Sequence, residues 1–147
     1  MKTRKRRDRG FTLIELLIVM VILGLLAALV GPRMFGKVGK SRQKAAKAQI
    51  TLLETALDTY KLDTSKYPTT SQGLEALRTQ PSGVERWDGP YLPKAVPMDP
   101  WGHPYEYRYP GEHGDYDIIS YGADGSPGGD EENLDIVSWR GIEEEQR

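Results

Sequence analysis

The feature that most constrains the fold of this chain is an apolar run near its N-terminus. Residues 11–30 read FTLIELLIVMVILGLLAALV and contain a single charged side chain, Glu15. A helix of about 20 residues rises about 30 Å, which matches the hydrocarbon core of a bilayer. The run therefore predicts a membrane-spanning helix, which we place at residues 11–33.

The residues before this run are strongly basic, because residues 1–10 hold six Lys or Arg side chains against one Asp. Positive flanks stay on the cytoplasmic side of a membrane, so this pattern predicts a cytoplasmic N-terminus and an external C-terminus. An ordinary secretory signal peptide is the alternative. It needs an apolar region of about 7–15 residues and then a small-residue cleavage site, and the following VGPRMFGKVGK offers no clean site of that kind.

Composition narrows the functional classes further. The net charge is −1, so no overall positive field indicates a nucleic-acid partner. The absence of cysteine excludes disulfides, thiolate zinc sites and cysteine nucleophiles. Both histidines, His103 and His113, lie in segments rich in proline or glycine with no nucleophile motif nearby. The sequence therefore does not predict an enzyme.

Glu15 needs an explanation, because a carboxylate in an apolar membrane helix is costly and normally has a partner. One interpretation places it close enough to the headgroups to reach water. The other pairs it with the α-amino group that Phe11 would carry if the chain were cut after Gly10. In a medium of low dielectric constant, that amine and the Glu15 of a parallel neighbour would attract and set the register between subunits.

The segment RGFTLIE at residues 9–15 resembles the N-terminal signal of type IV pilins and type II secretion pseudopilins. The resemblance implies that residues 1–10 are a leader, which a prepilin peptidase removes after Gly10 on the cytoplasmic side. It implies that the same enzyme methylates the new N-terminal Phe11. It also implies an assembly role for Glu15, the fifth residue of the mature chain.

Residues 34–63 predict an amphipathic helix that continues beyond the membrane. One apolar stripe recurs in it at helical spacing: Ala46, Ile50, Leu53, Leu57 and Tyr60. A stripe of this kind indicates a helix that packs against a small domain, and we expect the helix to end near Asp63.

The remaining residues, 64–147, predict a small head. Thr70 or Ser71 is expected to cap a short helix, and the six prolines of residues 81–104 argue for an ordered loop without regular structure. Alternating and β-branched patterns predict strands at residues 105–109, 116–121 and 136–139. We expect the tyrosines of the first strand and Trp139 to lie in the core. The prediction is an α+β fold in which the long helix packs against a small antiparallel sheet.

An acidic, glycine-rich loop occupies residues 121–135, YGADGSPGGDEENLD. Calcium takes about six to eight oxygen ligands in flexible geometry, and glycine lets a loop turn its carbonyl groups inward. The spacing does not match an EF-hand, and zinc would need His or Cys. From the residues alone, a calcium site and a solvated acidic loop both remain open.

Longer stretches resemble the major pseudopilins of type II secretion systems, namely LETALDTYKLDTSKYPTTSQGLEAL, GPYLPKAVPMDPWGHPYEY and the later YGADG. The similarity covers residues 9–140, whereas type IV pilins share only the N-terminal part. It implies a type IV pilin-like fold that binds Ca²⁺ in the acidic loop. The implied ligands are the carboxylates of Asp124 and Asp135, backbone oxygens of Tyr121 and Ser126, and a further group from Asp130 or Glu131.

The resemblance implies a structural function. Before assembly, subunits would be anchored in the inner membrane with their heads in the periplasm. They would then polymerise into a helical periplasmic filament that drives folded exoproteins across the outer membrane. Implied partners are further copies of the chain, minor pseudopilins, inner-membrane lipid, the prepilin peptidase, and the assembly platform with its secretion ATPase.

Three alternatives belong to other classes. A type IV pilin of a surface fibre, used for adhesion or motility, usually has a C-terminal disulfide loop, which a chain without cysteine cannot form. A minor pseudopilin often departs from Glu at the position of Glu15 or has a larger head. A single-pass anchored binding module would not form filaments.

Overall fold

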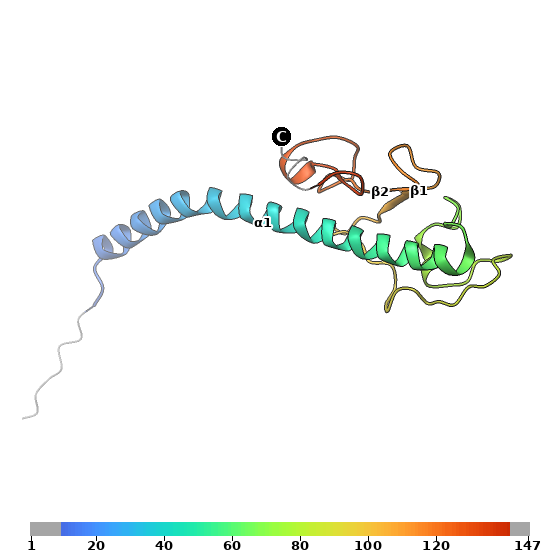
Figure 1. The fold of residues 1–147 in the computed structure, drawn as a ribbon. Helices are drawn as coiled ribbons and strands as arrows, with labels where there is room; N and C mark the ends of the chain where they lie inside the picture. Colours follow the sequence, from blue (N-terminus) through green and yellow to red (C-terminus); the bar gives the residue numbers. More distant parts are fainter. Residues whose placement is uncertain (1–9, 142–147) are drawn as a thin grey trace, which may run out of the picture. The chain divides into compact units, whose positions relative to one another are not determined.

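The computed structural model describes residues 10–141, apart from the side chains of residues 31–36. In chain order the elements are α1 (Leu13–Thr64), η1 (Leu74–Leu77), β1 (Glu106–Arg108), β2 (Asp117–Ser120), η2 (Glu131–Asn133) and β3 (Ile136–Val137) (Figure 1). The predicted α+β class, with one long N-terminal helix and a small antiparallel sheet, is confirmed. Residues 1–9 of the predicted leader lie outside the described part of the chain.

The chain divides into two units, Met1–Lys37 and Val38–Arg147. In the first unit, the segment Leu13–Val30 of α1 is long and apolar enough to cross a membrane, and none of it is buried. Large side chains along it are exposed, among them Leu13 at 88% and Met20 at 72%. This segment agrees in length and composition with the predicted span at residues 11–33.

In the second unit, the apolar stripe of α1 forms one side of the core. The five residues predicted for it are at most 2% exposed. They are packed in one cluster with residues of η1, of the sheet and of the strand ends, including Leu74, Leu77, Tyr105, Tyr107, Ile118 and Ile136. Each large side chain buried in this way stabilises the fold by about 1.5–3 kcal/mol.

The short helix η1 differs from its prediction at the start. It is a 3-10 helix whose N-cap is Gly73, without a side-chain cap, so the expected cap by Thr70 or Ser71 is wrong. The Thr70 hydroxyl instead donates to the Tyr109 carbonyl at 3.0 Å and accepts the Tyr109 N–H at 2.9 Å. Ser71 is hydrogen-bonded through its hydroxyl to Thr69 at 3.0 Å.

The sheet has the order β1-β2-β3, and both pairs are antiparallel. Tyr107 is opposite Ile118 and Ile119 is opposite Val137. The strands are shorter than predicted, because backbone groups at their ends bond elsewhere, as the Tyr109 N–H does. Tyr105 and Tyr107 are buried as expected, at 7% and 6% exposed, and burial raises the pKa of both phenols.

The proline-rich segment at residues 81–104 contains no helix or strand, as predicted. Side chains hold it in place: Trp87 Nε1 donates to the Ala76 carbonyl at 2.9 Å, and Tyr91 donates to Asp63 at 2.8 Å. Buried Asp99 accepts the His103 N–H at 2.8 Å with one oxygen and the Ser120 hydroxyl at 2.6 Å with the other. The segment is therefore an ordered loop tied to β2.

Candidate functional site

The predicted processing residues precede the first helix. Gly10 and Phe11 are exposed, Phe11 at 77%, and α1 begins at Leu13. The bond after Gly10 therefore lies in chain that is not part of a helix. Its cleavage and the methylation of Phe11 remain predictions.

The structure gives Glu15 a partner within its own chain, Thr12, which neither sequence-based interpretation of the Glu15 charge included. Its backbone N–H donates to the Thr12 hydroxyl at 3.3 Å, and its carboxylate accepts both the Thr12 N–H at 3.4 Å and the Thr12 hydroxyl at 3.3 Å. This reciprocal pattern is a capping box, in which the third residue after the cap bonds back to it. The sequence contains the signal for this capping box, the pattern Thr-x-x-Glu at residues 12–15. A carboxylate in the first turn of a helix is also favoured by the helix dipole.

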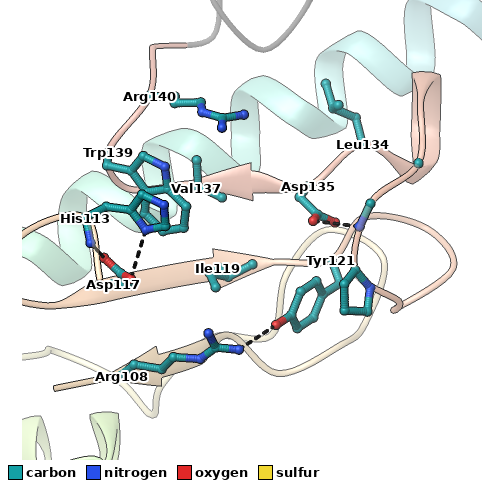
Figure 2. Close-up of a pocket in the computed structure, with 13 residues that line it drawn as sticks. Arg108, His113, Asp117, Ile119, Tyr121, Leu134, Asp135, Val137, Trp139 and Arg140 are labelled. Carbon is teal, nitrogen blue, oxygen red and sulfur yellow. Dashed lines mark hydrogen bonds and ion pairs between the residues drawn. The ribbon is translucent and has the colours of Figure 1, made fainter. Parts of the chain in front are cut away.

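The acidic loop leaves β2 after Ser120 and re-enters the sheet at Ile136. Its two ends meet at the sheet edge, where Tyr121 and Asp135 lie close to each other (Figure 2). The Ala123 N–H donates to the Glu132 carbonyl at 2.9 Å, which closes the loop. Gly122 has a φ of +64°, and a Cβ there would lie 2.8 Å from the Glu132 carbonyl oxygen. The close approach of the two sides therefore requires glycine.

Asp135 is the carboxylate with the most unusual surroundings. Its Oδ2 accepts the Gly128 N–H at 2.8 Å, whereas its Oδ1 is buried and has no hydrogen-bond partner. Burial raises the pKa of Asp135, the Gly128 N–H partly opposes this, and the charge of Asp124 raises it further. A buried carboxylate oxygen without a partner is costly unless a cation or donor meets it.

The other implied ligands are only partly brought together. Asp124 accepts the Ser126 N–H at 3.1 Å, so these two residues share one turn. Asp130 is exposed at the start of η2. Within residues 10–141, no group of three or more His, Asp or Glu side chains converges to hold a metal, so the Asp130 carboxylate does not join Asp124 and Asp135. Two carboxylates, one of them with an unpartnered buried oxygen, fit calcium when backbone carbonyls complete the shell.

A pocket of about 410 Å³ lies on the sheet beside this loop. Figure 2 shows Trp139 and His113 at one end of it and Tyr121 and Asp135 at the other. Trp139 is half-buried and stacks on the His113 ring, with centroids 3.8 Å apart, so the prediction that Trp139 is a core residue is wrong. It covers the His113 side chain, which bonds to buried Asp117 at 3.1 Å through Nδ1.

Comparisons with known proteins agree with one another over most of the chain. The family model described as type II secretion system (T2SS), protein G, matches residues 33–139, and the prokaryotic N-terminal methylation motif matches residues 5–31.

Two similar proteins are both named type II secretion system core protein G. The one from Pseudomonas aeruginosa is 45% identical over 139 residues, covering 92% of this chain and 98% of the relative. The one from Vibrio cholerae is 48% identical over 139 residues, covering 92% and 94%.

A solved structure is similar as well. The crystal structure of the major pseudopilin from the type 2 secretion system of enterohaemorrhagic Escherichia coli has a TM-score of 0.62 and 38% sequence identity. The match covers 74% of this chain and 95% of that one.

Proposed function

Because the chain belongs to the type II secretion system protein G family, we propose that it is the major structural subunit of a type II secretion pseudopilus. The observation that supports this best is the match of the head itself, since the family model covers residues 33–139. A type IV pilin would share only the N-terminal part, and the similar solved structure is a major pseudopilin. A surface-fibre pilin and a minor pseudopilin are therefore not favoured.

The subunit polymerises from the inner membrane into a helical periplasmic filament that drives export of folded exoproteins. The apolar side chains of residues 13–30, all exposed in a single chain, support this, because both lipid and neighbouring helices would cover them. Head-to-tail contacts of one kind between subunits leave a filament open at its ends. Minor pseudopilins, the assembly platform and the secretion ATPase are the further partners proposed.

The prepilin peptidase removes residues 1–10 and methylates Phe11 in this proposal. The N-terminal methylation motif at residues 5–31 supports it, as does the exposure of Gly10 and Phe11 ahead of the helix. Before assembly the subunit is anchored in the inner membrane by one helix, with its head in the periplasm.

Calcium binding is proposed for the acidic loop. Asp124 and Asp135 would supply carboxylates, and Tyr121 and Ser126 backbone oxygens. The ion would supply positive charge where one carboxylate oxygen of Asp135 is buried without a partner. That charge would offset the repulsion between Asp124 and Asp135 and hold the two ends of the loop together.

The proposed function is tested by the intact mass of the protein and by the phenotype of cells that lack or overexpress its gene. The intact mass of the membrane-extracted protein should show loss of residues 1–10 and the addition of one methyl group. Deleting the gene should abolish exoprotein secretion while twitching motility persists, and overexpression should produce filaments. An unprocessed mass, or a loss of motility with normal secretion, would overturn the proposed function.

A further inference from the structure

Three residues on one face of α1 contact the segment that contains Asp135. Gly39, Gln43 and Lys47 are spaced by four residues, so they follow one another along the same side of the helix. All three belong to the unit Val38–Arg147. Their contacts lie on both sides of Asp135 in the chain.

Gly39 and Gln43 contact the residues before Asp135. Gln43 is 4% exposed, and its Nε2 donates to the carbonyl of Glu131, the first residue of η2. A Cβ at Gly39 would lie 2.7 Å from Cγ of Glu132. The helix surface is therefore in direct contact with η2, through the Glu131 carbonyl and the Glu132 side chain.

Lys47 contacts the residues after Asp135. Its Nζ donates to the carbonyls of Val137 at 2.6 Å, Ser138 at 3.1 Å and Arg140 at 2.6 Å. A lysine ammonium has three N–H donors, so this geometry uses all of them. Hydrogen bonds from a charged donor are stronger than those between neutral groups. Lys47 thus fixes β3 and the chain that follows it.

We propose that Gln43 and Lys47 are positioning residues for the metal loop, holding the backbone on either side of Asp135 so that its carboxylate is in place before the ion arrives. This inference rests on the proposed calcium binding and extends it to a helix outside the loop. Preorganised groups bind more tightly because less freedom is lost on binding. The bond from the Gly128 N–H to Asp135, at 2.8 Å, orients the same carboxylate from within the loop.

The coupling is reciprocal, because a residue that raises calcium affinity is itself held more firmly when calcium is bound. Residues 39–47 follow the apolar segment Leu13–Val30 of the same helix. Calcium in the loop would therefore stabilise the helix turns where α1 enters the head.

The experiment compares the mature full-length protein in detergent with Lys47→Met, Gln43→Ala and the control Lys44→Met, at an exposed position of α1. Calcium affinity is measured by isothermal titration calorimetry at a temperature where circular dichroism shows all four proteins folded without the ion. Lys47→Met should raise the Kd for calcium about tenfold, Gln43→Ala severalfold, and Lys44→Met less than about twofold.

The outcomes are distinguishable. If Lys47→Met and Gln43→Ala lower the Tm of the calcium-free protein but bind calcium like the wild type, the two residues are merely structural and the inference is overturned. If the wild type binds no calcium, the proposed metal site fails and the inference falls with it. If Lys47→Met does not fold, hydrogen exchange of the Gly128 amide is measured in calcium-free Gln43→Ala instead. Faster exchange than in the wild type supports the inference. Unchanged exchange overturns it.

Discussion

Asp117 is a carboxylate that the fold keeps ionised although it is 1% exposed. Burial acts to raise the pKa of Asp117, but the Glu112 N–H at 2.9 Å and the His113 ring and N–H outweigh it and lower the pKa below its usual 3.8. The His113 ring is held in turn by stacking on Trp139. The turn between β1 and β2 is therefore organised around one buried charge.

The pH dependence of stability follows from this lowered pKa. Because the folded-state pKa is below the unfolded-state value, Asp117 stabilises the fold above about pH 5, and this contribution is lost as the pH falls through the folded-state pKa. Asp117→Asn should lower the free energy of unfolding by about 1–3 kcal/mol at pH 5. This loss should become smaller toward pH 3. Urea unfolding at each pH measures it. Asp115→Asn is the control, since Asp115 is exposed and pairs with Lys61 at 3.2 Å on the surface. A cost independent of pH would contradict the assignment.

Asp135 gives a prediction about metal removal. Wild-type protein should gain about 2.7 kcal/mol of stability when calcium is present at a hundred times its Kd, and chelator should remove that gain. Asp135→Asn should gain nothing from calcium. In chelator it should be at least as stable as the wild type, since the buried unpartnered oxygen no longer carries charge. Thermal unfolding with and without chelator tests this, and equal gains in the two proteins would exclude Asp135 as a ligand.

At the scale of elements, α1 was predictable because its signals are periodic. The apolar stripe around Ile50 repeats over several turns of the helix. A turn-rich segment marks the end of the helix, which the structure places at Thr64. The short elements were less predictable because long-range bonds decide them. Thr70 has the chemistry of a helix cap, yet its hydroxyl bonds to Tyr109, 39 residues away. Local patterns contain no information about that partner.

The candidate site also has one part that could be predicted from the sequence and one part that could not. The acidic loop and the pair Asp124 and Asp135 could be selected from composition and resemblance. The contact of Gln43 with this loop and those of Lys47 with the residues after it could not, because 88 to 93 residues separate the partners and a lysine on a helix is usually solvated. Trp139 was expected in the core as the aromatic end of the third strand, but its ring is half-buried and stacks on His113.

The two faces of α1 in the head should respond differently to truncation. Leu57 is fully buried, so Leu57→Ala should cost about 2–5 kcal/mol of unfolding free energy. Leu52 is 66% exposed, so Leu52→Ala should change it by no more than about 0.5 kcal/mol. Chemical denaturation of both variants measures the difference. Similar costs at the two positions would contradict the assigned core face.

At the scale of the whole molecule, a monomer leaves much apolar surface uncovered. Among the described residues, most of the exposed large apolar side chains belong to the segment Leu13–Val30. The head-proximal half of α1 adds two separate apolar side chains, Leu52 and Leu62, which are 66% and 82% exposed. An exposed apolar surface as long as that of Leu13–Val30 marks a contact surface, which agrees with a subunit that functions in a polymer.

A charge at exposed Leu52 should interfere with assembly and leave the head folded. Leu52→Glu should keep the thermal stability of the wild type, because the side chain is exposed, but reduce filament formation and exoprotein secretion severalfold, because a carboxylate would be desolvated between subunits. Electron microscopy of overexpressing cells and a secretion assay are the measurements. Leu52→Met, which retains the apolar surface, should form filaments normally. Normal filaments from Leu52→Glu would place the subunit contact elsewhere.

The contacts of α1 with the head have a practical consequence for protein engineering. The helix supplies core side chains from Ala46 to Tyr60 and contacts the acidic loop from Gly39 onward. A soluble fragment for crystallisation or vaccine work therefore has to begin before Gly39 if it is to keep the loop supported. A fragment that starts two turns later would lack Gln43 and so lose its contact with the Glu131 carbonyl. The useful boundary for expression is thus set by the loop at the far end of the sequence.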